Sequence, residues 1–184
     1  FTTECDMWPY PLTVHERYSR FLNRLNNELH AAGIGHLNYQ LHERFPTWAP
    51  EFDIHGLHRL NRPLKPYDPG PTSPPGTRRP GPVGMDYGAD SQATIMFCPQ
   101  SKALQDAYVH ALARRLDEYG DDGVYLDGTG GVNACRNTLH GCGYRAEDGS
   151  IRPTNPVFAN REFMRRLYIA VKQRRPDGVL DVHQ

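Results

Sequence analysis

The sequence has 184 residues, 21 acidic and 21 basic residues, and 38% hydrophobic residues. This length fits one ordinary domain with its own core, because domains usually run to about 100–200 residues. The balanced charge gives no reason to expect nucleic acid or an anionic membrane as a partner. No window reaches the ~18 consecutive apolar residues that a membrane-spanning helix needs.

The two ends of the sequence suggest a piece of a longer or processed chain. The chain begins Phe1-Thr2-Thr3 instead of with Met, and it stops at His183-Gln184. We therefore expect a fragment or a processed product.

The four cysteines are Cys5, Cys98, Cys135 and Cys142. The last two flank a short loop and could form a disulfide in an oxidising compartment. The CxxC spacing of common structural zinc sites is absent, which argues against such a site. Cys98 ends an apolar run and is predicted to be a small buried hydrophobic residue.

The first predicted element is a helix over about residues 14–32. Thr13 and Glu16 have the capping-box spacing, in which the two side chains satisfy free backbone N–H groups. Apolar residues then repeat at helical spacing: Val14, Tyr18, Phe21, Leu22, Leu25 and Leu29. Gly33 supplies the stop, and residues 34–41 form a short strand candidate.

Residues 42–90 are expected to form a long proline-rich loop. This segment holds ten of the sixteen prolines, which fix φ and remove backbone donors, and so exclude a helix or a central strand. A free linker is one interpretation. We favour an ordered excursion, because its first half has apolar side chains to bury: Phe45, Trp48, Phe52, Leu57 and Leu60.

Regular patterns resume after residue 92. The expected elements, in chain order, are a buried strand at 93–98, a helix from Ser101 to about Glu118, a strand at 124–126, a second long loop at 128–157, a helix at about 161–173 capped by Asn160, and a strand at 179–183. The 161–173 helix is expected to turn Phe163, Met164, Leu167, Tyr168 and Val171 inward.

The alternation of strands and helices predicts an α/β fold with a parallel sheet covered by helices. Connections after strands are long and those after helices are short, as in a (β/α) TIM-type barrel. Such a barrel needs about 250 residues and eight strands. The chain offers four, or five if Glu4–Trp8 is one. We therefore predict one partial barrel domain over residues 1–184, completed by further polypeptide. A doubly wound sheet is the alternative, but no glycine-rich phosphate fingerprint follows any strand.

Polar residues at strand ends are the candidate catalytic groups, because these ends meet at the active-site mouth of a barrel. Asp127 closes the strand of DDGVYLDGTGG, and His183 closes the last strand. Glu43 and Glu51 follow the first strand. Asp127 is the preferred catalytic residue, and the alternative is an Asp that opens a turn before Gly128.

The loop after Asp127 is rich in hydrogen-bonding side chains between glycines. Such donors and acceptors, with planar aromatic faces, suit a polyhydroxylated ligand such as a sugar. The predicted substrate-binding residues are Asn133, Arg136, Asn137, His140, Tyr144, His183 and Trp48. A loop merely pinned by a Cys135–Cys142 bridge would explain the same composition.

Four stretches together resemble the barrel domain of glycoside hydrolase family 123-like proteins: EYGDDGVYLDG, CRNTLHGCGY, RPTNPVFANREFMRRLY and VLDVHQ. The resemblance covers mainly residues 118–184. It implies cleavage of a glycosidic bond at the C-terminal face of a barrel, in a mostly secreted bacterial-type protein. Characterised relatives use an Asp-Glu pair on N-acetylhexosamine sugars. Asp127 matches the Asp, whereas Gly128 stands where the Glu is expected.

Glycoside hydrolysis in general requires two carboxyl groups. We assign Asp127 the charged role and name Glu43 first for the acid. Glu51, Asp181 (if its strand adopts the other register) and a residue outside this chain are the alternatives. No cofactor and no metal are expected, since no HxH or HExxH spacing supports a site through His140, His183 and Asp127. The alternative function is a non-catalytic carbohydrate-binding or structural component of an extracellular assembly.

Overall fold

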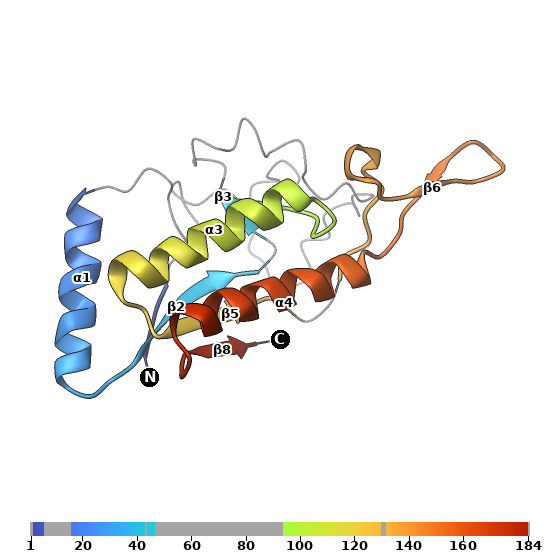
Figure 1. Ribbon diagram of the computed structural model, residues 1–184. Coiled ribbons are helices and arrows are strands. Elements are labelled where there is room, and N and C mark those ends of the chain that lie inside the picture. Colours follow the sequence, from blue (N-terminus) through green and yellow to red (C-terminus); the bar gives the residue numbers. More distant parts are fainter. Residues whose placement is uncertain (1, 6–15, 43, 47–93, 130–131, 184) are drawn as a thin grey trace, which may run out of the picture.

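The computed structural model describes residues 2–5, 16–42, 44–46, 94–129 and 132–183 (Figure 1). Most of the proline-rich segment, with Glu43, Trp48 and Glu51, lies outside the described residues, and the predictions for it stay predictions. The same holds for the assignment of residues 1–184 to one domain. Among the described helices, none is long and apolar enough to cross a bilayer.

A four-stranded parallel sheet organises the chain. Its strands, in spatial order, are β1 (Thr2–Cys5), β2 (His36–Leu41), β5 (Gly123–Asp127) and β8 (Val179–Val182). Every neighbouring pair in this sheet is parallel. The spatial order follows the chain order without a reversal, so the prediction of a parallel α/β sheet is confirmed.

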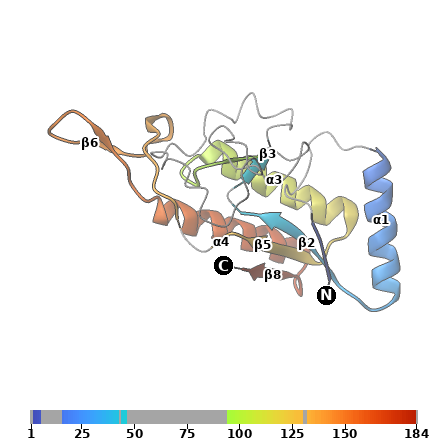
Figure 2. The ribbon, with the colours of Figure 1, turned by 180° about the vertical axis from the view of Figure 1, so that it is seen from behind.

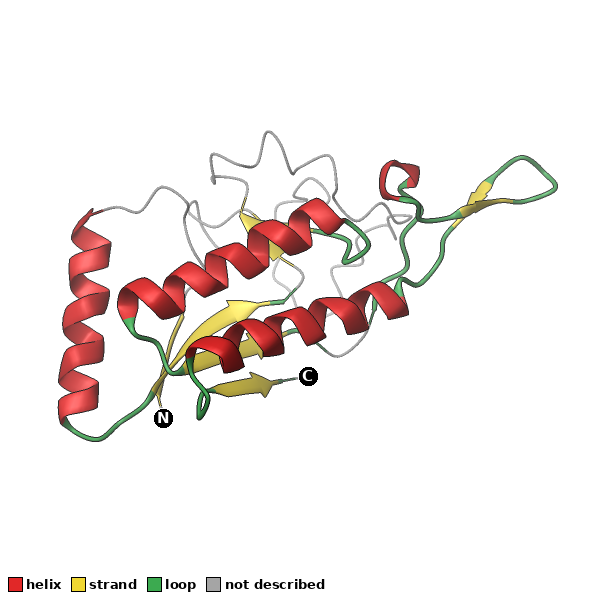
Figure 3. Ribbon diagram, viewed as in Figure 1, coloured by secondary structure: helices red, strands yellow, loops and turns green. Residues whose placement is uncertain are grey.

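Among the described residues, three helices connect these strands: α1 (Glu16–Ala31), α3 (Lys102–Tyr119) and α4 (Val157–Arg174). Helices α3 and α4 run side by side along one face of the sheet, while α1 stands across its end (Figures 1 and 3). Viewed from behind, the strands lie in front of α4 (Figure 2). The sheet therefore has one face packed on α3 and α4 and another face that points away from them.

The predicted strand at 93–98 exists but does not join the parallel sheet. Strand β4 (Thr94–Met96) pairs antiparallel with β3 (Arg44–Pro46) in a separate two-stranded sheet. A short apolar run indicates a buried strand without identifying its partner, which is why the prediction was wrong. The fourth strand of the parallel sheet is β1, which overlaps the optional strand predicted at 4–8.

The loop at 128–157 contains its own structure. A 3-10 turn, η2, spans Thr138–His140, and β6 (Tyr144–Arg145) pairs with β7 (Ile151–Arg152) as a hairpin. The hairpin projects from the end of the molecule, beyond the first turn of α4 (Figure 1). Glycine supplies the sharp exit from β5, because Gly128 adopts a φ of 76° in the left-handed region.

Helix boundaries follow the sequence signals at α3 and depart from them at α4. The Ser101 hydroxyl accepts a hydrogen bond from the Leu104 amide at 3.4 Å, as predicted. Helix α4 begins at Val157 instead of 161, after Pro156, because a helix start does not need the N–H that proline lacks. The prediction of Asn160 as the cap is therefore wrong.

The core lies between the sheet and the helix pair. Val124 and Leu126 alternate along β5 toward α3 and α4, whereas Tyr125 lies on the other face. Ten buried residues form this core: Phe97, Leu104, Tyr108, Leu112, Leu116, Val124, Leu126, Phe163, Leu167 and Val171. Tyr168 was predicted to point inward but is 51% exposed, and the Lys172 ammonium lies over its ring. It covers the outer surface of α4 instead.

A buried polar network closes the N-terminal ends of the strands. The Asp121 carboxylate accepts hydrogen bonds from Arg115 Nε and Asn26 Nδ2, each at 2.8 Å, and contacts His36 Nδ1 at 3.2 Å. Burial alone would raise the pKa of Asp121, but the His36 hydrogen bond and the Arg115 charge outweigh it and hold that pKa below its usual value. This network ties α1, α3, β2 and the start of β5 together.

Candidate functional site

Asp127 is the last residue of β5, at the C-terminal edge of the sheet. Its backbone carbonyl accepts a hydrogen bond from the His42 amide at 2.9 Å, and Leu41 is its register partner on β2. On the other side, the His183 amide donates to the Leu126 carbonyl at 2.8 Å. Three strand ends therefore meet around Asp127, as their polar residues predict.

The Asp127 carboxylate is held by three donors from three directions. The Tyr39 hydroxyl donates to Oδ2, the Gly128 amide donates to Oδ1 at 2.7 Å, and His183 Nδ1 lies 3.0 Å from Oδ1. The Tyr39 hydrogen bond, and next the His183 contact, hold the pKa of Asp127 below its ordinary value. The side chain remains 30% exposed, so an ionised and reachable carboxylate occupies the strand tip.

Aromatic rings line the same face of the sheet. The Tyr125 ring stacks on Tyr39, with centroids 5.3 Å apart, and on His183, with centroids 5.7 Å apart. Loss of hydration, and then the charges of Asp127 and Asp181, raise the pKa of Tyr125. The carboxylate thus lies beside a row of three stacked rings on the face away from α3 and α4.

Asp181 shares this face with Tyr125. The two residues are register partners on β8 and β5. His183 follows Asp181 by two positions, so its side chain lies on the same face. Asp181 is exposed. Of the carboxylates named from the sequence as possible partners of Asp127, Asp181 is the one that the described residues contain.

Two of the predicted sugar-binding residues of the 128–157 loop line a depression whose lining does not include Asp127. Arg136 and Asn137 line an open depression of about 460 Å³ together with Thr138, Ser150 and Ile151. The Asn137 side chain also caps η2 by accepting from the Leu139 amide at 3.0 Å. Tyr144 is 58% exposed on β6. Carbohydrate binding by Asn133, Arg136, Asn137, His140 and Tyr144 stays a prediction.

The predicted disulfide is absent, since Cys135 and Cys142 are both buried and neither is in a disulfide. The loop is fastened instead by a backbone bridge between Cys135 and Thr154, with both N–H···O distances at 2.9 Å. The Gly143 amide also donates to Thr154 Oγ1 at 2.9 Å. The residues of this loop are therefore ordered by hydrogen bonds, and its thiols are available for other chemistry.

Within the described part of the chain, one group could hold a metal ion: Cys98, Cys135, His140 and Cys142. Asp127 and His183 do not belong to it. The metal interpretation through His140, His183 and Asp127 thus gains no support, because His140 turns toward Cys135.

Comparison with solved structures finds six matching chains, including the following two. A cycloisomaltooligosaccharide glucanotransferase of a Paenibacillus species, solved with cycloisomaltoheptaose, superposes with a TM-score of 0.56 at 14% identity, over 90% of this chain and 20% of that one. The α-galactosidase TtGalA of Thermus thermophilus, solved with stachyose, gives a TM-score of 0.46 at 15% identity, over 83% of this chain and 26% of that one.

The first of these likenesses shows that the α/β arrangement of this chain is similar to that of one part of the glucanotransferase. Both neighbours are carbohydrate-active enzymes, and the chain spans about a fifth to a quarter of their lengths. No family model matches the sequence, and no curated protein matches it. The specific resemblance to glycoside hydrolase family 123 therefore stays a prediction.

His42 is a residue of the strand tips that the sequence reasoning missed. It follows β2 directly, is 1% exposed, and stacks on Phe163 of α4 with ring centroids 5.3 Å apart. Burial lowers the pKa of His42 to about 4. The two-residue alternation of β2 could have indicated it, because His42 falls on the same side of the chain as the buried Asn38 and Gln40.

We expect His42 to make the protein acid-sensitive. In the unfolded chain His42 binds a proton below about pH 6.5, whereas in the folded chain it does so only below about pH 4. Stability contributed by neutral His42 is thus present above pH 6.5 and is lost as the pH falls toward 4, at about 1.4 kcal/mol per pH unit. Urea unfolding at several pH values measures this slope. The His42→Phe variant should be flatter over that window, and an unchanged slope would contradict the assignment.

Proposed function

We propose that this chain is part of a glycoside hydrolase-like protein that cleaves a glycosidic bond at the C-terminal edge of the sheet. The observation that carries the proposal is Asp127: an ionised, partly exposed carboxylate at a central strand tip, beside three stacked rings. Structural similarity to a glucanotransferase at the level of fold agrees with it.

A (β/α) barrel is the fold that we propose for the complete protein. Strand order follows chain order without the reversal that defines a doubly wound sheet. Helices α3 and α4 cover one face (Figure 1), and the long loops leave the C-terminal strand ends, where barrel enzymes carry their active sites. The face with Tyr39 and Tyr125 would then line the barrel interior, and further polypeptide would supply the remaining strands.

In this proposal Asp127 is the charged member of the catalytic pair. The Tyr39 hydroxyl and the Gly128 amide favour the ionised form, which suits a nucleophile or a stabiliser of positive charge at the sugar carbon. Gly128 at φ 76° also explains why no Glu follows Asp127, since a side chain in this conformation would be strained. An Asp-Glu pair of the family 123 kind is therefore disfavoured by the backbone itself.

Asp181 is our candidate for the second carboxyl group within the described residues. Its register partner Tyr125 lies two residues before Asp127 on the neighbouring strand. Strand spacing and rise put the two Cα atoms about 8 Å apart on one face of the sheet. Side chains that start from such positions can place their carboxyl groups at the separation of roughly 5–9.5 Å that glycoside hydrolysis uses. Glu43, the first choice from sequence, and Glu51 lie outside the described residues and remain the competing acids.

The test is a hydrolysis screen on purified protein containing this chain, with aryl glycosides and oligosaccharides as substrates. Asp127→Asn should reduce kcat by at least about 10³-fold without loss of folding, because it removes the charge and keeps the shape. Asp181→Asn and Glu43→Gln are compared to identify the acid: the variant that alters the pH profile of kcat marks it. Asp148→Asn, on the projecting hairpin, is the matched control and should leave kcat unchanged. Full activity of Asp127→Asn would disprove the catalytic role.

A non-catalytic carbohydrate-binding role is the second candidate. The three groups that hold the Asp127 carboxylate, from Tyr39, Gly128 and His183, favour this role because they already occupy both of its oxygens. Isothermal titration with the oligosaccharides of the screen separates the two functions. Binding without turnover by the unmodified protein, weakened in a Tyr125→Ala variant, would support this role over hydrolysis.

A further inference from the structure

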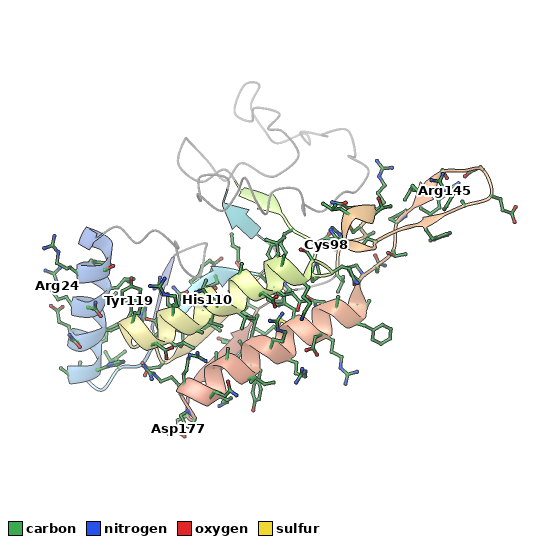
Figure 4. All side chains as sticks on the ribbon, turned by 45° about the horizontal axis from the view of Figure 1, so that its top comes forward. Arg24, Cys98, His110, Tyr119, Arg145 and Asp177 are labelled. Atoms are coloured by element: carbon green, nitrogen blue, oxygen red, sulfur yellow. The ribbon has the colours of Figure 1, made fainter. Side chains whose placement is uncertain are left out.

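Four potential metal ligands converge from two distant parts of the chain. Cys98 follows β4 and precedes the first turn of α3, and the other three come from the C-x4-H-x-C stretch at 135–142. Cys98 lies where the start of α3 meets the loop that leads to the hairpin (Figure 4). All four ligand atoms, three sulfurs and one imidazole nitrogen, lie within 4.8 Å of one another.

Two of the distances inside this cluster are close to the edges of a tetrahedral zinc site. Cys98 Sγ lies 3.6 Å from Cys142 Sγ, and Cys135 Sγ lies 3.3 Å from His140 Nε2. Zinc bonds of about 2.3 Å to sulfur and about 2.0–2.1 Å to nitrogen give tetrahedral edges of about 3.8 Å and about 3.5 Å. A disulfide instead needs sulfurs about 2.05 Å apart, so the cluster has the spacing of ligands around a common centre.

The three sulfurs of the cluster are buried, whereas His140 is partly exposed. Cys98 and Cys135 are 0% exposed, and Cys142 is 2% exposed. The Asn137 amide donates to Cys135 Sγ at 3.4 Å, the kind of contact that orients a ligating sulfur. A bound dication would hold the sulfurs as thiolates.

We propose that Cys98, Cys135, His140 and Cys142 bind one Zn²⁺ ion in a structural Cys₃His site. Four protein ligands complete the tetrahedron and leave no position for water, which distinguishes a structural site from a catalytic one. The ion fastens the 135–142 loop to the end of β4 and the start of α3. The β6–β7 hairpin, which projects beyond that loop, is thereby anchored to the sheet and the helix pair.

Zinc content is the first test, on protein purified under reducing conditions without added chelator. Elemental analysis should find about one zinc per chain, and replacement by Co²⁺ should give the intense thiolate charge-transfer and d–d absorption of a tetrahedral sulfur site. Removing the metal with a chelator should lower the melting temperature, and zinc should restore it. Less than a tenth of an equivalent after incubation with zinc, or iron in its place, would overturn the proposal.

Variants locate the ion. Cys142→Ser and His140→Ala should each lose most of the bound zinc, whereas Cys5→Ser removes a thiol and leaves all four proposed ligands, so it should keep one equivalent. If the ligand variants fail to fold, the cobalt spectrum of the unmodified protein still decides the matter. Mass analysis after alkylation gives the remaining outcome: a disulfide between any two of Cys98, Cys135 and Cys142 in the unmodified protein would refute a zinc site.

Discussion

Replacing Asp121 by alanine should lower the free energy of unfolding by about 3–5 kcal/mol, because it leaves a buried guanidinium without its counter-charge. Arg115 and Asp121 are both 0% exposed, and their 2.8 Å contact sits inside a shell formed by Asn26 and His36. The loss therefore includes the dehydration of the Arg115 charge that remains. Urea unfolding at neutral pH, followed by circular dichroism, measures it.

The neighbouring Asp122 provides the matched control. Its carboxylate accepts hydrogen bonds from the His36 amide and contacts His30, each at 2.8 Å, but it is 30% exposed and no buried cation depends on it. Asp122→Ala should cost only about 1 kcal/mol, the value of an ordinary hydrogen bond. Equal losses of unfolding free energy in the two variants would show that the buried charge pair contributes no more to stability than the partly exposed Asp122.

Replacing Gly123 by alanine should separate β8 from β5 and cost about 3 kcal/mol or more. A Cβ atom at Gly123 would lie 2.0 Å from the Val179 carbonyl oxygen, and 2.8 Å from the Val179 carbonyl carbon and amide nitrogen. These are backbone atoms that no side-chain rotation can move away. Hydrogen exchange should show faster exchange at the β8 amides, together with the loss of unfolding free energy.

Gly128 is the control for this experiment. It also has a positive φ, 76°, but nothing lies within 4 Å of an added Cβ. Gly128→Ala should therefore cost only the left-handed backbone energy of about 1–2 kcal/mol and leave exchange at β8 unchanged. If the two variants were equally stable, close approach between β5 and β8 would not be the reason for glycine at position 123.

Periodicity was enough to predict the elements that bury one continuous face. The helix after Ser101 and the strands around Val124 and Val179 were found because their apolar residues recur at the helical or strand period. Pairing is a different property, since any apolar strand can join any sheet. The 93–98 segment was therefore found as a strand and assigned to the wrong sheet.

The sequence predicted the part of the candidate site that depends only on which residue ends each strand. Asp127 and His183 end adjacent strands, so their contact follows from topology once the sheet is parallel. The Tyr39 hydrogen bond depends on the register of β2 against β5, which the sequence does not state. The contact of Cys98 with Cys142 joins two loops across α3 and β5, and no local spacing reveals such a meeting.

Strand β8 ends the described sheet, and its outer side has consequences for handling the protein. Val182 is 44% exposed there, on a strand whose β5 side alone is paired in the described sheet. An outer edge with apolar side chains invites strand addition by another molecule. We therefore expect the chain to self-associate through this edge as its concentration rises, and light scattering over a concentration series would measure that association.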